Sequence, residues 1–219
     1  MERQQIIEKV LESKIIVIMR GMIEEQLIAT VDAMYKGGIR LVEVTFDQSG
    51  KIPDEITAKN IRTLTDTFEG RVLVGAGTVM TTAQVELAHK SGAKYIISPD
   101  SCREVIERTV ELGMVSMPGV FTPTEAANAH RWGADFVKLF PNSEVNISYL
   151  ECLTVPLSHI RFLAVGGVNA DNIADYLGAG AVGVGVATSI VNKKLIAEEK
   201  YEEITKLAFA HTKAAGIEL

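Results

Sequence analysis

The sequence predicts an α/β protein of the (β/α)8 barrel class that begins with an N-terminal helix. Short apolar runs typical of strands alternate with amphipathic stretches typical of helices along nearly all 219 residues. Eight such strands can be counted, and the connections between them are short and even. Eight alternating units at this length favour one barrel domain over residues 1–219. The runner-up is an open, doubly wound sheet.

The first half of the chain is expected to supply the opening helix and four strand–helix units. Apolar residues at helical spacing indicate the opening helix: Ile6, Ile7, Val10 and Leu11. Four apolar runs typical of strands buried on both faces cover residues 15–20, 40–46, 72–79 and 94–99. Helices are expected over residues 24–35, 54–68, 82–90 and 103–112, and glycines end three of them.

The second half repeats this pattern. Strands are expected over residues 115–119, 136–141, 161–168 and 182–187. Helices are expected over residues 124–132, 147–153, 172–177 and 198–215. Gly133 and Gly178 end two of these helices. No linker or low-complexity tract interrupts the alternation, which supports one domain.

Composition excludes several classes of partner. A net charge of −6 leaves no basic surface for nucleic acid. No apolar run reaches the length of a membrane span, and the amino terminus does not resemble a signal peptide. Cys102 and Cys152 have neither metal nor redox spacing, so a reducing cytoplasmic setting is expected. The expected partner is a small molecule, and an anionic one would need a local cationic or N–H-rich site.

A lysine lies within the sixth apolar run, Phe136-Val-Lys-Leu-Phe-Pro141. Alternate side chains of a strand share a face, so Lys138 is expected to point the same way as Phe136 and Phe140. Burial without a partner lowers the pKa of an ammonium group, and a neutral amine attacks ketones to form Schiff bases. The alternative is a lysine whose stem covers apolar surface while its charge stays in water.

Unusual residues at other strand ends extend this interpretation, because the active site of such barrels lies there. Glu43 is an acid within a strand body and could shuttle protons beside Lys138, or form a buried ion pair that holds the barrel together. Gly166 and Gly167 follow the seventh strand, where backbone N–H groups often bind phosphate; the alternative is a plain tight turn. Further candidates at strand ends are Arg20, Thr45, Thr78, Pro99, Phe140 and Thr188.

Two other classes of function stay open. Glu43 and Asp47 share a strand face and could ligate a divalent cation, as in a metal-dependent lyase. No histidine or third carboxylate lies at a predicted strand end, which favours chemistry without a metal or another cofactor. The third class is a binding or regulatory protein that kept the barrel and lost the reaction.

These residues resemble a known family, the 2-keto-3-deoxy-6-phosphogluconate aldolases, which also includes 4-hydroxy-2-oxoglutarate aldolases. The resemblance covers almost the whole chain and rests on six short motifs in the right order. They are Val42-Glu-Val-Thr45, Gly75-Ala-Gly-Thr78, Ile97-Ser-Pro99, Met117-Pro-Gly119, Lys138-Leu-Phe-Pro141 and Gly166-Gly167. The resemblance implies a class I aldolase that releases pyruvate and glyceraldehyde 3-phosphate without a metal or cofactor, and a homotrimer.

Carried over residue by residue, the resemblance makes Lys138 the Schiff-base lysine and Glu43 the general acid/base. Thr78 and Arg20 match residues that hold the pyruvate carboxylate or lie at the floor of the site. The remaining matches are substrate-binding positions: Pro99 and Phe140 at the walls, and Gly166, Gly167 and Thr188 at the phosphate. Thr45, on the same strand face as Glu43, is also expected to bind substrate.

The sequence departs from the family pattern at a few positions. Asp47 stands where some members have arginine, and Val165 where others have threonine. Asn142, Ser143 and Asp100 also replace the usual residues. These changes bear on the substrate more than on the chemistry. We predict a 2-keto-3-deoxy-6-phosphogluconate aldolase, with 4-hydroxy-2-oxoglutarate or a related 2-keto-3-deoxy acid as the alternative substrate.

Overall fold

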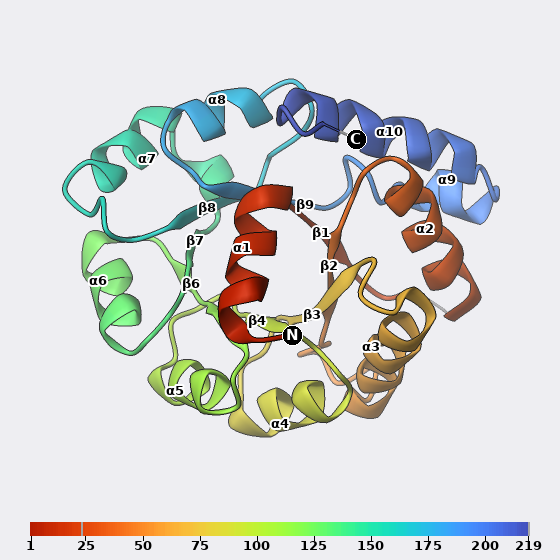
Figure 1. Ribbon diagram of the computed structural model, residues 1–219, viewed down its shortest axis with the longest axis horizontal. Helices are drawn as coiled ribbons and strands as arrows, with labels where there is room; N and C mark the ends of the chain where they lie inside the picture. The colour runs from red at the N-terminus through yellow and green to blue at the C-terminus, as the bar shows by residue number, and fades with distance from the viewer. Residues whose placement is uncertain (23, 219) are drawn as a thin grey trace.

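The computed structural model describes residues 1–22 and 24–218 and shows a ring of parallel strands inside a ring of helices (Figure 1). The strands are β1 (Ile15–Met19), β2 (Leu41–Thr45), β3 (Leu73–Gly77), β4 (Tyr95–Ile97), β5 (Val115–Met117), β6 (Gly119–Val120), β7 (Val137–Leu139), β8 (Phe162–Val165) and β9 (Gly183–Val186). Their order in the sheet is β5-β4-β3-β2-β1-β9-β8-β7-β6. All paired neighbours run parallel.

The two outer members of this order belong to one stretch of chain. Pro118 separates β5 from β6, and proline has no N–H for a strand ladder. The first part pairs with β4 and the second with β7, so this stretch joins both edges of the sheet and closes the ring. Eight strands were expected; the barrel is confirmed, and the ninth label arises from this interruption.

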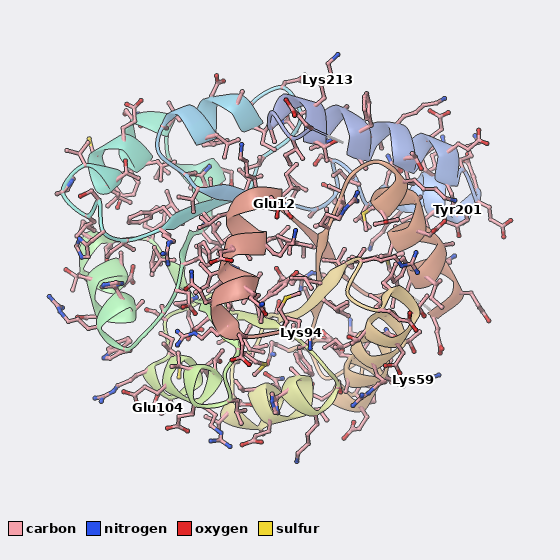
Figure 2. The ribbon with its side chains drawn as sticks, in the orientation of Figure 1. Glu12, Lys59, Lys94, Glu104, Tyr201 and Lys213 are labelled. Atoms are coloured by element: carbon pink, nitrogen blue, oxygen red, sulfur yellow. The ribbon has the colours of Figure 1, made fainter. Side chains whose placement is uncertain are left out.

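The helices of the described residues follow the strands around the outside of the ring, as the sequence predicts, except the first, which precedes β1. They are α1 (Arg3–Ser13), α2 (Glu24–Lys36), α3 (Asp54–Phe68), α4 (Thr82–Lys90), α5 (Arg103–Glu111), α6 (Pro123–Arg131), α7 (Ile147–Thr154), α8 (Ile173–Gly178), α9 (Lys193–Ala197) and α10 (Tyr201–Ala214). The 3-10 turn η1 (Asn142–Glu144) and α9 are additions to the predicted elements. Labelled charged side chains such as Lys59, Glu104 and Lys213 project outward from the ring (Figure 2).

Two separate apolar layers hold the barrel together. One lies between strands and helices and includes Val42, Val137 and Leu139. The other fills the inside of the ring and includes Leu41 and Phe136. Successive residues of a strand thus alternate between the layers, as the pleat requires. The sequence-based assignment of Phe136 to one face and Val137 to the other is confirmed.

Helix α1 covers one mouth of the barrel, and Figure 1 shows it across the middle of the ring. Its buried residues Ile6, Ile7 and Val10 pack into the inner apolar layer. Arg3 anchors the helix through an ion pair of 2.8 Å with Asp135. The covered mouth lies at the amino ends of the strands, so the carboxyl ends form the other mouth.

Glycines inside the ring leave room for two large side chains. A Cβ at Gly75 would lie 2.0 Å from the ring of Tyr95, whose hydroxyl donates to the Val42 carbonyl over 2.6 Å. A Cβ at Gly77 would lie 1.6 Å from Oε1 of Glu43. Strand β3 therefore carries glycine where the neighbouring strands place an aromatic ring and a carboxylate inside the barrel.

No helix in the described ranges has both the length and the apolar character needed to cross a membrane.

Candidate active site

Lys138 lies inside the barrel, in the middle of β7, between Gly119 on β6 and Leu163 on β8. Only 6 % of its surface is exposed. Burial is the largest cause that lowers the pKa of this amine below its usual value, and the charge of Arg20 acts in the same direction. The carboxylates of Glu43 and Asp100 oppose this shift. Because burial disfavours a charged ammonium group at this strand position, Lys138 is suited to be a neutral amine.

Glu43 lies inside the ring on β2 and is 3 % exposed. Burial raises the pKa of its carboxyl group, and the positive charges of Lys138 and Arg20 oppose that increase. Within the described residues no salt bridge joins Glu43 to Lys138. The two groups act on each other through space, so the structure does not support the alternative role of Glu43 in a direct ion pair.

Arg20 and Thr78 meet at the carboxyl ends of β1 and β3. A guanidinium nitrogen of Arg20 lies 3.5 Å from Oγ1 of Thr78. Thr78 has a φ of 54°, a left-handed backbone conformation that is strained for a β-branched residue. The Gln48 side chain donates to the Thr78 carbonyl over 2.8 Å and supports this conformation. Strain of this kind is typical of residues that face a ligand.

A cavity of about 550 Å³ opens over the carboxyl ends of β1, β9 and β8. Five of the predicted site residues line it: Arg20, Phe140, Gly166, Gly167 and Thr188. In the sheet order, the strand of Glu43 borders this arc on one side and the strand of Lys138 on the other. The Phe140 ring centre is 4.8 Å from Nζ of Lys138 and connects the cavity with the lysine.

The floor of this cavity is rich in free backbone N–H groups. Gly166 and Gly167 have φ values of 109° and 75°, which turn the chain sharply after β8. Among the described residues, no protein acceptor receives the N–H groups of Gly166, Gly167, Thr188 or Ser189. Converging N–H groups of this kind bind anions without a cationic side chain. The cavity can therefore hold a phosphate group.

Two predicted site residues lie beside this cavity rather than along it. Thr45 is buried, and its hydroxyl donates to the Met19 carbonyl over 3.4 Å. Pro99 lies next to Gly119: a Cβ added at Gly119 would come within 2.2 Å of the Pro99 carbonyl oxygen. Thr45 ends β2, which is also the strand of Glu43, and Pro99 follows β4, so both lie at carboxyl ends of strands around the same mouth.

Asp47 uses both of its carboxylate oxygens within its own loop. They accept hydrogen bonds from the backbone N–H groups of Ser49, Lys51 and Ile52 and from the Ser49 hydroxyl. These bonds, led by the Ser49 hydroxyl, lower the pKa of the carboxyl group. The described part of the chain contains no group of three metal-ligating side chains. The geometry of Asp47 therefore gives no support to the metal-dependent alternative.

Four polar residues of this region were not among the predicted site residues. Asn169, Ser189 and Lys193 line the cavity, and Gln48 supports Thr78. Lys193 begins α9, whose cap Asn192 accepts from two backbone N–H groups of the helix. The sequence signal for this short helix was Asn192, a residue type that favours the N-cap position, followed after two lysines by the apolar pair Leu195 and Ile196. Gln48 has no sequence signal of its own. Ser189 follows the eighth predicted strand, but its partners Val168 and His211 come from distant parts of the chain.

A second hollow, of about 390 Å³, lies at the other mouth of the barrel. Lys9 of α1, Tyr35, Arg40 and Arg71 line it. The two arginines donate to nearby backbone carbonyls, and Lys9 pairs with Glu12 over 2.6 Å. The cations of this hollow are thus already engaged, and Lys138 faces the opposite mouth.

Comparison with known proteins identifies a family and similar chains. Residues 6–207 match the family described as KDPG and KHG aldolase. The chain is 32% identical to 2-dehydro-3-deoxy-6-phosphogalactonate aldolase of Escherichia coli K12, covering 91% of this chain and 93% of the relative. It is 30% identical to 2-dehydro-3-deoxy-phosphogluconate aldolase of Haemophilus influenzae, covering 93% of each.

A solved structure is also similar to this chain. It is a KDPG aldolase from Legionella pneumophila with pyruvate captured at low pH as a covalent carbinolamine intermediate. The TM-score is 0.83 with 27% identity, and the match covers 93% of this chain and 97% of the other.

Proposed function

The chain belongs to the KDPG and KHG aldolase family, and on this premise we propose that Lys138 is the amine with which it forms a Schiff base to a 2-keto-3-deoxy acid. The observation that carries the proposal is the burial of Lys138 inside the barrel, which lowers the pKa of its amine. A neutral amine is the form that attacks a carbonyl carbon. The chain is an aldolase, a lyase; the residues, the mechanism and the substrate are proposed.

The first half of the proposed reaction forms the covalent bond. The lone pair of the Lys138 nitrogen attacks the C2 ketone of the substrate and gives a carbinolamine. Glu43, whose pKa is raised by burial, donates a proton to the departing hydroxyl, and water leaves. The product is a protonated imine between Lys138 and C2, and Glu43 is then a carboxylate.

The second half breaks the carbon–carbon bond. The Glu43 carboxylate takes the proton of the C4 hydroxyl, and the C4 oxygen becomes an aldehyde. The electron pair of the C3–C4 bond moves toward the imine and forms an enamine on C2 and C3. The aldehyde, glyceraldehyde 3-phosphate, leaves. C3 then takes the proton back, and water hydrolyses the imine to pyruvate and free Lys138.

The two ends of the substrate are proposed to bind at different parts of the mouth. Arg20, with Thr78 at 3.5 Å, is suited to the carboxylate at C1. The free N–H groups after β8 and β9 are suited to the phosphate at C6. An extended six-carbon acid would then pass Val165, which lines the cavity next to Gly166.

The configuration at C4 distinguishes two candidate substrates, and both yield the same two products. The predicted substrate is 2-keto-3-deoxy-6-phosphogluconate. The galactonate epimer is the second candidate, because the similar Escherichia coli protein is named for it. Val165 brings an aliphatic wall and no hydroxyl to the cavity, so it does not offer the hydrogen bond that a threonine would offer to a substrate hydroxyl.

Two measurements test these proposals separately. Borohydride reduction in the presence of pyruvate, followed by peptide mass spectrometry, should place a single adduct on Lys138. A coupled pyruvate-release assay should then compare the gluconate and galactonate 6-phosphates, their unphosphorylated acids and 4-hydroxy-2-oxoglutarate. No adduct, or an adduct on another lysine, would overturn the mechanism. Equal turnover of phosphorylated and unphosphorylated acids would overturn the phosphate assignment.

A homotrimer and a cytoplasmic location complete the proposal. The trimer rests on the family resemblance, and sedimentation equilibrium measures it directly. The cytoplasmic location is supported by Cys102 and Cys152, which are both free thiols in the structure.

A further inference from the structure

His211 is a buried titratable residue that the proposed reaction does not use. It lies on α10, and 2 % of its surface is exposed. Its ring connects two parts of the chain: Nδ1 is 2.7 Å from the Leu207 carbonyl oxygen, and Nε2 is 3.1 Å from Oγ of Ser189. Ser189 lines the cavity described above. A buried imidazole thus contacts the edge of the anion cavity from behind.

The bonding pattern determines how the ring is oriented. A carbonyl oxygen only accepts, so Nδ1 must carry the hydrogen that goes to Leu207. This leaves Nε2 facing the Ser189 hydroxyl. Oγ of Ser189 is also 3.3 Å from the Val168 carbonyl oxygen. The ring, the hydroxyl and the carbonyl form one chain of contacts from α10 through the loop after β9 to the loop after β8.

These two loops are the ones that supply the free N–H groups. Ser189 is adjacent to Thr188, and Val168 is adjacent to Gly167. The spacing between the loops decides whether the N–H groups of both can reach one phosphate. We infer that His211 is a positioning residue that fixes Ser189, and with it the loop after β9, in place beside the loop after β8, so that the two loops form one anion-binding surface. This inference rests on the proposed function. It means that α10, through His211, affects the affinity for the phosphorylated substrate.

Burial supports the geometry, since it lowers the pKa of His211 and so favours the neutral ring. A neutral ring with hydrogen on Nδ1 accepts the one Ser189 hydroxyl hydrogen at Nε2, so Oγ of Ser189 then contacts the Val168 carbonyl without donating to it. The hydrogen bond to Leu207 and the charge of Asp171 act against this shift. His211 contacts no reacting atom, so the expected consequence of its loss is weaker phosphate binding with Lys138 chemistry intact.

Four variants separate positioning from simple stability. His211→Leu removes both bonds of the ring, and His211→Gln keeps a polar group near the place of Nε2. Thr212→Val is the matched control, because Thr212 is the next residue of α10, is fully buried, and donates over 3.0 Å to Gly37, away from the cavity. Ser189→Ala breaks the same contact from the loop side and serves if His211→Leu does not fold.

We expect His211→Leu to raise KM for the 6-phosphorylated acid and the inhibition constant of inorganic phosphate roughly tenfold, the effect of losing about one hydrogen bond to an anion. Its kcat and the rate at which pyruvate exchanges its C3 hydrogens in heavy water should stay within about twofold, since the exchange needs only Lys138 and Glu43. His211→Gln should recover most of the affinity, and Thr212→Val should change neither constant.

Two results would overturn the inference. One is a His211→Leu variant, or Ser189→Ala in its place, with unchanged KM and phosphate inhibition. The other is a rise in KM together with a fall in kcat and in the rate of pyruvate exchange, reproduced by Thr212→Val. That pattern would indicate a general effect on stability. A wild-type protein without pyruvate exchange would instead contradict the proposed function itself, so the two failures can be distinguished.

Discussion

The proposed reactive interior and the proposed anion loops of this barrel are neighbours, but they use different parts of the chain. The proposed interior relies on two ionisable side chains, Lys138 and Glu43, buried on β7 and β2. The anion loops rely on backbone N–H groups around Gly166, Gly167 and Thr188, at the surface of an open cavity. Chemistry that depends on a shifted pKa needs burial, whereas recognition of a permanent anion needs only converging dipoles.

This difference predicts two kinds of variant. Changes in the interior should reduce turnover and leave phosphate binding unaffected. Changes in the loops should weaken the binding of phosphorylated substrate and leave the reaction with pyruvate unaffected.

Lys138→Met should have the largest effect, because it keeps the unbranched stem and removes the nucleophile. We expect kcat to fall on the order of 10⁴-fold or more, with no borohydride adduct. Inhibition or protection by inorganic phosphate should persist, since the loops are unchanged. Lys94→Met, at the start of the fourth predicted strand, is the control and should keep full activity. A trapped adduct in the Lys138 variant would contradict the assignment.

Glu43→Gln should lower kcat by about 10²- to 10⁴-fold, the usual range for a general acid or base. The negative charge of Glu43 raises the pKa of Lys138, so its removal should lower that pKa further. The pH at which Lys138 becomes half reactive toward an amine reagent should therefore lie below 10.5 in the wild type and lower still in the variant. A midpoint that moves upward would show that Glu43 does not act on the lysine.

Gly77→Ala tests whether space, and not only charge, controls Glu43. The new Cβ would lie 1.6 Å from Oε1 and 2.4 Å from Cγ of Glu43, so the carboxylate must move. We expect kcat to fall roughly 10- to 100-fold, because small displacements of a catalytic group cost about that much, while the thermal midpoint changes little. Gly178→Ala is the control, since its Cβ meets open space. Equal kcat in the two variants would remove Glu43 from the mechanism.

Gly166→Ala should have the smallest effect and should act on affinity. The residue has a φ of 109°, and a Cβ would lie 3.2 Å from the Asn142 nitrogen. The strain should turn the local N–H groups and raise KM for the phosphorylated acid roughly tenfold. The same measurement with an unphosphorylated acid should show little change. Matching losses for both substrates would mean that this turn serves the interior as well.

The residues inside the barrel could be predicted from the sequence because the side chains of a strand alternate between its two faces. An apolar run with lysine at its centre predicts the face on which Lys138 lies, and the same reasoning places Glu43 inside the ring. Gly166 and Gly167 were recognisable as a turn after a strand. Arg20 and Thr78 were named as candidates, but their contact of 3.5 Å joins two strands that are not sequence neighbours.

The supporting residues could not be predicted in this way. Thr78 has a left-handed backbone that no residue pattern indicates, and Gln48, which supports it, lies in a loop after another strand. Ser189 and His211 meet across 22 residues of chain, after one short helix and most of another. The predicted eight strands are interrupted at Pro118, and the consequence of that proline depends on which strands lie on either side.

The sequence by itself determined the alternation of strands and helices, the inward face of the lysine strand and the kinds of group at the strand ends. The reason is that periodicity and residue chemistry are local properties of the chain. The tertiary structure alone decided how deeply Lys138 is buried, which carboxylates lie near enough to shift its pKa and which loops converge on one cavity. These depend on the closing of the ring, because pKa values and anion binding arise from groups that are distant in the chain and close in space.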